Sequence, residues 1–214
     1  AGSDIWFHGQ NVYRQSLSPD LIEHTCQILK EMDAVYLLEG FDRIYVSEKA
    51  QRILLGKEVL PNDNPELVRW KKYFRQKPNL YPIEEWTPDG EKVPKITFML
   101  FQKEQVEKVK EIMSEHFHVV FFPAAYDDFW NGELISRTAD KGTAIQKAAE
   151  LLHIGIEDTI AFGDSMNDYE MIEKAGCGVV MANGDEYLKT IADRICESVQ
   201  EDGVVRELER MHLI

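Results

Sequence analysis

The last third of the sequence alternates between helical and extended patterns, and this alternation constrains the fold more than any other feature. Helices are expected at residues 141–152, 168–174, 186–192 and 203–211, with strands at 159–162, 178–181 and 194–196. The loops between them are short. Strands that alternate with helices in this way form a parallel sheet covered by helices. We therefore expect residues 137–214 to form part of a doubly wound α/β domain.

The preceding residues follow a different pattern. Residues 5–7 and 12–13 flank a turn, which predicts a short hairpin. Ser18 and Pro19 are typical of a helix start. Strands are expected at 35–38, 43–46, 95–101 and 119–122, with helices at 49–55, 65–75 and after 101. The pair Asn131-Gly132 predicts a turn between two extended pieces. We expect an α+β domain over residues 17–136, with residues 1–16 as a remnant of the other domain.

The charge balance excludes some classes of partner. Lys and Arg number 24 and Asp and Glu number 38, which gives a net charge of −14. A nucleic-acid binder needs a basic face to displace counterions, and an anionic membrane attracts basic segments. The chain is therefore not expected to bind nucleic acid or membranes. A small phosphorylated substrate stays compatible with this charge, because a few local cations hold it.

The cysteines and apolar segments indicate a cytoplasmic location. Cys26, Cys177 and Cys196 are odd in number and widely spaced, as expected of free thiols in a reducing compartment. No Cys/His cluster suggests zinc. The apolar stretches are too short to span a bilayer, and no signal-peptide pattern is present.

The segment Gly163-Asp164-Ser165-Met166-Asn167-Asp168 is the main candidate site. It follows an expected strand directly and precedes a helix, and α/β proteins bind ligands at the carboxyl ends of strands. Asp164 and Asp168 offer the oxygen ligands that Mg²⁺ prefers. Asn167 and the loop amides would donate to a phosphoryl oxygen. The alternative is an ordinary turn in which Asp168 starts the helix.

A second candidate is Lys141, which follows Asp140 at the start of a helix. A cation in the first turn opposes the helix dipole, so its presence there is explained if it binds an anion such as phosphate. The alternative is a solvated surface lysine. The loop 182–185 follows the next strand and would lie beside residues 163–168. It reads equally well as a turn in which Asp185 caps a helix.

Several other residues receive structural interpretations. No nucleophile elbow surrounds Ser165, and no Walker A or HExxH motif occurs. His116 and His118 are interpreted as strand-end residues rather than metal ligands. The tryptophans at positions 70, 86 and 130 are interpreted as packing residues or as a wall on the substrate side. They are not interpreted as a platform for stacking nucleic-acid bases, because the chain is acidic.

Taken together, Lys141-Gly142, the segments 163–168 and 178–183, and Asp202-Gly203-Val204 resemble the haloacid dehalogenase superfamily, most closely its Cof-type phosphatases. The resemblance implies a parallel-sheet α/β core with a large inserted α+β cap at residues 17–136. It implies that Lys141 neutralises the phosphate and the attacking carboxylate, and that Asn167 contacts phosphate. Asp164 and Asp168 are then the acids of a Mg²⁺ site.

The chain departs from the family pattern in one respect. The family's Asp-x-Asp-Gly motif, which carries the nucleophile and the general acid/base, occurs nowhere in residues 1–214, and Asp127-Asp128 has the wrong spacing. The motif is expected before residue 1. The resemblance thus implies a Mg²⁺-dependent phosphatase acting on a small phosphorylated metabolite, such as a sugar phosphate, through an aspartyl-phosphate, with residues 1–214 alone inactive. The alternative is a non-catalytic binding or regulatory module with the same fold.

Overall fold

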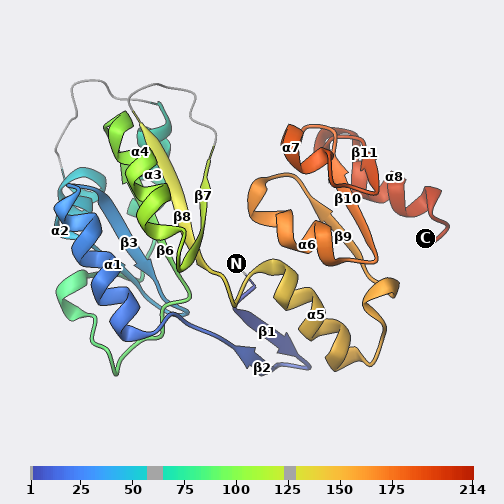
Figure 1. The fold of residues 1–214 in the computed structure, drawn as a ribbon, viewed down its shortest axis with the longest axis horizontal. Helices are drawn as coiled ribbons and strands as arrows, with labels where there is room; N and C mark the ends of the chain where they lie inside the picture. The colour runs from blue at the N-terminus through green and yellow to red at the C-terminus, as the bar shows by residue number, and fades with distance from the viewer. Residues whose placement is uncertain (1, 57–64, 123–128) are drawn as a thin grey trace. The chain divides into compact units, whose positions relative to one another are not determined.

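The computed structural model describes residues 2–56, 65–122 and 129–214. The chain divides into two compact units. Unit 1 consists of Ala1–Gln15 and Thr138–Ile214, and unit 2 consists of Ser16–Arg137. Figure 1 colours the chain by residue number, from blue at the N-terminus to red at the C-terminus.

Unit 1 contains a three-stranded parallel sheet in the order β11-β10-β9. Its strands are β9 (Ile160–Gly163), β10 (Cys177–Met181) and β11 (Arg194–Cys196). Its helices are α5 (Lys141–Leu152), α6 (Tyr169–Lys174), α7 (Glu186–Lys189) and α8 (Gly203–Arg210), with 3₁₀ turns at Ile156–Asp158, Met166–Asp168 and Val199–Glu201. The expected α/β fold with a parallel sheet is confirmed.

A hairpin at the start of the chain also belongs to unit 1. Strands β1 (Asp4–Phe7) and β2 (Gln10–Arg14) pair in antiparallel fashion, as the sequence predicts. The connecting residues His8 and Gly9 both have positive φ, 50° and 77°. Two such residues match the right-handed twist of the paired strands.

Unit 2 is built on a six-stranded sheet in the order β5-β4-β3-β6-β8-β7. The strands are β3 (Val35–Glu39), β4 (Ile44–Val46), β5 (Leu80–Pro82), β6 (Lys95–Leu100), β7 (Phe117–Phe121) and β8 (Trp130–Ser136). Only β4 and β5 are parallel among the described pairs. The helices are α1 (Pro19–Glu31), α2 (Glu48–Ala50), α3 (Pro65–Arg75) and α4 (Lys103–Met113), with a π-helical turn at Gln51–Leu55 and a 3₁₀ turn at Ile83–Glu85.

Each face of this sheet carries its own apolar core, because successive side chains of a strand point to opposite faces. Tyr36 and Leu38 pack with apolar residues of α1 and α4. Val35 and Leu37 pack on the opposite face with the π-helical turn and with Phe74 of α3. Helices therefore cover both faces of the sheet.

The prediction of a turn at Asn131-Gly132 is wrong. Both residues lie inside β8, which pairs with β6 and β7. A Cβ atom on Gly132 would lie 2.7 Å from the ring of Phe98 and 2.3 Å from the carbonyl oxygen of Val120. Glycine is present because the backbone passes close to its neighbours, and packing on both sides overrides the local preference for a turn.

Cys26, Cys177 and Cys196 are free thiols. Among the helices that the structure describes, none has the length and apolar content required to cross a membrane.

Candidate active site

The candidate site in unit 1 is built on the loop that follows β9. This loop runs from Gly163 through the 3₁₀ turn Met166–Asp168 into α6. A Cβ atom on Gly163 would lie 2.7 Å from the Cβ atom of Asp168. The absence of a side chain at Gly163 therefore allows the loop to fold back onto Asp168.

Asp168 is the centre of the loop's hydrogen bonds. It is 5% exposed. Its Oδ2 accepts the backbone N–H of Asp164 at 3.0 Å and that of Ser165 at 3.3 Å. Its Oδ1 accepts a hydrogen bond from the ammonium of Lys141. Buried carboxylates require such partners, and here both oxygens have them.

Lys141 is the first residue of α5. Asp140 caps this helix by accepting the N–H of Thr143 at 2.6 Å, as the sequence predicts. The Lys141 Nζ reaches Asn167 Oδ1 at 3.2 Å in addition to Asp168. The Lys141 side chain is 31% exposed, so the ammonium keeps access to solvent. The structure thus brings Lys141, Asn167 and Asp168 together at the carboxyl end of β9.

Asp164 differs from Asp168 in its surroundings. Its side chain is exposed, and its carboxylate makes no hydrogen bond or ion pair within the described part of the chain. Its backbone carbonyl accepts the N–H of Asp185 at 2.9 Å, so loop 182–185 lies against loop 163–168, as expected. Asp185 also caps α7, because its carboxylate accepts the Tyr187 N–H at 2.8 Å. The alternative interpretation, a turn in which Asp185 caps a helix, is therefore correct as well.

The donor set fits a Mg²⁺ ion only in part. The Asp164 carboxylate is a hard oxygen ligand with no competing partner among the described residues, which suits Mg²⁺. Both oxygens of Asp168 are already used, one of them by a cation. In the described ranges, no group of three or more His, Cys, Asp or Glu side chains is placed to hold a metal ion. These residues therefore supply one ligand rather than a complete coordination shell.

Sequence reasoning did not anticipate a role for Ser165. Its hydroxyl donates to Asn167 Oδ1 at 2.7 Å, which fixes the amide oxygen that also faces Lys141. The spacing of Ser165 and Asp168 matches the Ser-x-x-acid signature of a helix start, which predicts the hydrogen bond from the Ser165 backbone N–H to Asp168 but not the contact with Asn167. Asp127 and Asp128 lie outside the described residues.

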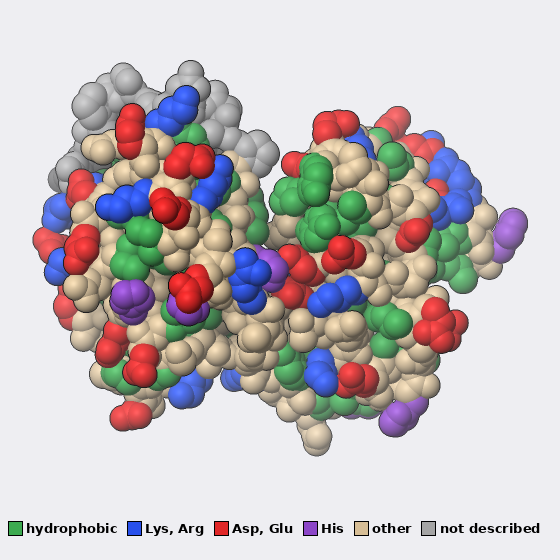
Figure 2. Space-filling view, viewed as in Figure 1, with side chains coloured by type: hydrophobic (Ala, Val, Ile, Leu, Met, Phe, Trp, Pro, Cys, Tyr) green, Lys and Arg blue, Asp and Glu red, His purple; other side chains and the backbone are tan. Residues whose placement is uncertain are grey.

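An aromatic pair borders the same loop. The rings of Tyr169, which follows Asp168 directly, and Tyr187 stack with centroids 6.2 Å apart and an interplanar angle of 9°. On the face shown in Figure 2, hydrophobic side chains gather over α6 and α7. The loop therefore places its polar groups beside an apolar surface of unit 1.

A family model described as haloacid dehalogenase-like hydrolase matches residues 1–208. The putative phosphatase YkrA of Bacillus subtilis is 27% identical over the whole chain, which corresponds to 74% of that protein. A phosphoglycolate phosphatase of Methanosarcina acetivorans is 43% identical over 74 residues, which cover 35% of this chain and only 33% of that protein.

The fold has counterparts among solved structures. A haloacid dehalogenase-like hydrolase from B. subtilis superposes with a TM-score of 0.76 at 23% identity, over 97% of this chain and 76% of that one. At this identity the likeness supports a shared fold.

Proposed function

This chain belongs to the haloacid dehalogenase-like hydrolase family, and we propose that the protein is a Mg²⁺-dependent phosphatase that hydrolyses a phosphate monoester of a small metabolite, such as a sugar phosphate. The observation that carries this proposal is the position of Lys141. Its ammonium lies at the start of α5 and is held by Asn167 and Asp168 at the carboxyl end of β9. Similarity to phosphatases, including one named for phosphoglycolate, supports the reaction and the small size of the substrate.

In this proposal Lys141 binds the phosphoryl group. Its positive charge would offset negative charge that develops on the phosphoryl oxygens, an effect that is large in a preorganised site. Asn167 would orient the same group through its amide. Asp168 would act as a positioning residue, because it holds the ammonium and two backbone amides of the loop.

Asp164 is the residue proposed to hold Mg²⁺. A bound Mg²⁺ would supply further positive charge to the phosphoryl oxygens. The sequence also suggested Asp168 as a ligand. We propose the positioning role for it instead, because its two oxygens already have partners.

The nucleophile has no counterpart among the motifs of this sequence. An Asp-x-Asp-Gly motif does not occur in residues 1–214. The proposal therefore takes the nucleophile and the general acid/base from outside these residues, and expects residues 1–214 alone to bind phosphate without turnover. Unit 2 is proposed to be the cap that selects the substrate.

The alternative function is a non-catalytic binding module, which the absence of that motif favours. The full-length protein distinguishes the two. We expect it to release phosphate from p-nitrophenyl phosphate with Mg²⁺ present and to stop when EDTA is added. A lack of turnover on a broad panel of phosphate monoesters would favour the non-catalytic module.

A further inference from the structure

Unit 2 contains a cavity of about 270 Å³ to which the proposed phosphatase chemistry assigns no role. It lies between the end of α1, the start of β3, helix α2 and the 3₁₀ turn Ile83–Glu85. Its charged lining residues are Lys30, Lys49, Arg52, Asp33, Glu48 and Glu84. Small-molecule sites occupy roughly 300–1,000 Å³, so this cavity suits a ligand at the small end of that range.

The cavity lies away from the end of the sheet where the chain enters and leaves unit 2. Leu17, the second residue of the unit, donates its N–H to the carbonyl oxygen of Val93, two residues before β6. Ile135, near the other boundary of the unit, pairs with the first residue of β6. Tyr36 pairs instead with Phe98, further along β6. The cavity is therefore separate from the strand ends that adjoin both linkers to unit 1.

Two buried hydroxyl groups belong to the cavity lining. Tyr36 is 6% exposed and Ser47 is 3% exposed. The Ser47 Oγ accepts the N–H of Tyr36 at 3.3 Å and that of Ala50 at 3.2 Å, which occupies its two lone pairs. Neither hydroxyl donates a hydrogen bond to another of the described residues. Buried donors ordinarily have an acceptor, so the cavity suits a ligand that accepts hydrogen bonds from both.

The Tyr36 hydroxyl keeps its proton at neutral pH. Burial raises the pKa of Tyr36 to about 12, and Cys26 and Glu84 contribute to the same shift. Glu84 lines the same cavity, and charges act strongly only at short range in a protein. Tyr36 therefore offers a hydrogen-bond donor, and no negative charge, on the side of the cavity that Glu84 borders.

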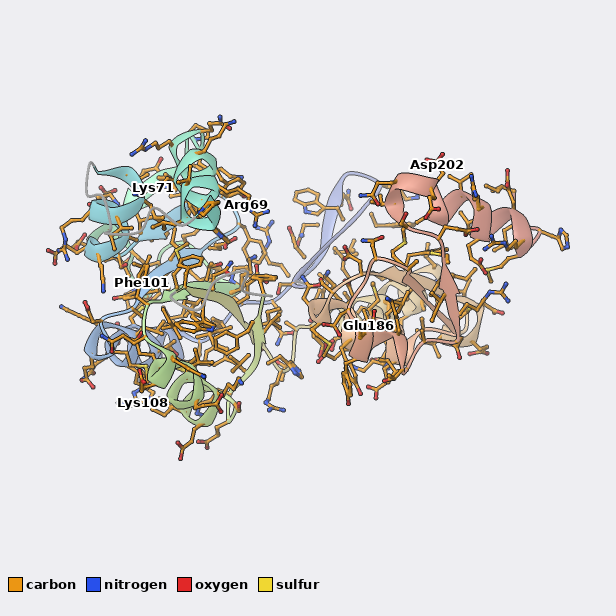
Figure 3. All side chains as sticks on the ribbon, turned by 90° about the horizontal axis from the view of Figure 1, so that it is seen from above. Arg69, Lys71, Phe101, Lys108, Glu186 and Asp202 are labelled. Carbon is orange, nitrogen blue, oxygen red and sulfur yellow. The ribbon has the colours of Figure 1, made fainter. Side chains whose placement is uncertain are left out.

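Four of the charged lining residues neutralise one another. The Lys49 Nζ lies 2.6 Å from Asp33 Oδ2, and the Arg52 Nη1 lies 2.7 Å from Glu48 Oε1. The Lys49 ammonium also lies 5.4 Å from the centre of the Phe101 ring, which is labelled in Figure 3. These two ion pairs border the cavity without adding net charge to it.

Lys30 and Glu84 are the charged lining residues that remain. Both are exposed, and neither forms an ion pair or a side-chain hydrogen bond with another residue in the described ranges. A phosphate ester carries roughly two negative charges and would face three carboxylates around this cavity. A ligand with one charge of each sign complements Lys30 and Glu84 together and leaves the cavity neutral.

We propose that this cavity binds a small zwitterion of the α-amino acid class. Its carboxylate accepts hydrogen bonds from Tyr36 and Ser47 and is neutralised by Lys30, as charged acceptors make the stronger hydrogen bonds. Its ammonium faces Glu84. Ile83 supplies apolar surface for its side chain. The ligand carries no phosphate, so it is not the substrate of the proposed phosphatase, and its binding is measured without turnover.

The test is a calorimetric titration of the full-length protein with L-leucine and two blocked analogues. L-leucinamide lacks the carboxylate, and N-acetyl-L-leucine lacks the ammonium. We expect L-leucine to bind with a Kd below about 10 mM and each analogue to bind about tenfold more weakly, because each loses one charged contact. Inorganic phosphate is expected not to displace L-leucine.

Two variants remove one proposed contact each. Tyr36→Phe and Glu84→Gln are expected to raise the Kd of L-leucine by about tenfold, with folding checked by circular dichroism. Tyr73→Phe and Glu85→Gln are the matched controls and are expected to bind like the parent protein. Tyr73 is 49% exposed on α3, and Glu85 follows Glu84 in the same 3₁₀ turn, but neither residue lines the cavity.

Four results would overturn the proposal. The first is a lack of L-leucine binding at about 10 mM, and the second is a blocked analogue that binds as tightly as L-leucine. The third is displacement of L-leucine by inorganic phosphate, which would assign the cavity to anions. The fourth is binding by folded Tyr36→Phe and Glu84→Gln variants that equals binding by the parent protein.

Discussion

The ammonium of Lys141 forms an ion pair with the carboxylate of Asp168, 27 residues later in the sequence. Asp168 also accepts the backbone N–H groups of Asp164 and Ser165. One buried carboxylate therefore joins the start of α5 to the loop after β9. This connection fixes the place of the cation that we propose binds phosphate.

Asp168→Asn is expected to destabilise the protein. The substitution keeps the side-chain shape but removes the negative charge that holds Lys141. The loss of stability is limited because the Lys141 ammonium is partly solvated. We expect the free energy of unfolding to fall by about 1–3 kcal/mol in urea titrations. Asp164→Asn is the control in the same loop and is expected to leave stability unchanged, since that carboxylate is exposed. Equal stability of the two variants would contradict the structural role assigned to Asp168.

Gly142→Ala tests the close approach of α5 to α6. A Cβ atom at this position would lie 2.3 Å from the carbonyl oxygen of Glu170. In an exposed helix the change stabilises by roughly 1 kcal/mol, because alanine is the better helix former. Here we expect a loss of about 1–3 kcal/mol from overpacking, measured by thermal or urea unfolding. The exposed Gln146→Ala on the same helix is the control, and a more stable Gly142→Ala variant would show that the helices are not in contact there.

Cys26 is expected to resist alkylation in the native protein. Burial, with a smaller contribution from Glu23, raises the pKa of its thiol to about 12. The thiolate is the reactive form, so iodoacetamide at pH 8 should leave Cys26 unmodified until urea is added, as mapped by mass spectrometry. Because the folded state raises this pKa, keeping the Cys26 thiol protonated contributes to the free energy of unfolding. That contribution is fully present below about pH 8.5, the ordinary pKa of a thiol, and is lost as the pH rises toward 12. Rapid native labelling of Cys26 would contradict this burial.

Asp164→Asn is expected to weaken the response to metal without unfolding the protein. The change removes the exposed carboxylate proposed to bind Mg²⁺. We expect the Mg²⁺ concentration for half-maximal phosphatase activity of the full-length protein to rise by about tenfold or more, because a charged ligand is worth roughly 1.4 kcal/mol or more. Asp158→Asn, another exposed acid of unit 1, is the control. An unchanged Mg²⁺ titration would remove Asp164 from the metal site.

The α/β part of the fold was predictable because strands and helices alternate there and because α5 and α7 begin at capping aspartates. Asp140 predicts α5, and the observed helix has the expected bounds, Lys141–Leu152. Asp185 predicts the start of α7, but that helix ends at Lys189 rather than at residue 192. The Thr190 hydroxyl donates to the carbonyl oxygen of Tyr187 at 2.6 Å and takes part in a turn there. Helix ends depend on such local contacts, which the apolar pattern does not encode.

Other features depended on tertiary register. Asn131-Gly132 reads locally as a turn, and only pairing with two strands makes it part of β8. The sequence also does not show that Glu39, Lys95 and Glu133 lie side by side, because they are up to 94 residues apart and meet only through strand pairing. The loop after β9 was found from its place at a strand end. Which of its two acids is buried depends on side-chain direction, which the spacing does not specify.

The measurement that tests the central claim most directly compares Lys141→Met with Lys147→Met in the full-length protein. Both lysines lie on α5, but Lys147 pairs with Glu150 on the surface. With Mg²⁺ and p-nitrophenyl phosphate, and with folding checked by circular dichroism, we expect Lys141→Met to lower kcat/KM by about 10²–10³-fold. Lys147→Met should keep the activity of the parent protein. Full activity in Lys141→Met, or an equal loss in both variants, would contradict the assignment of Lys141 as the phosphate-binding cation.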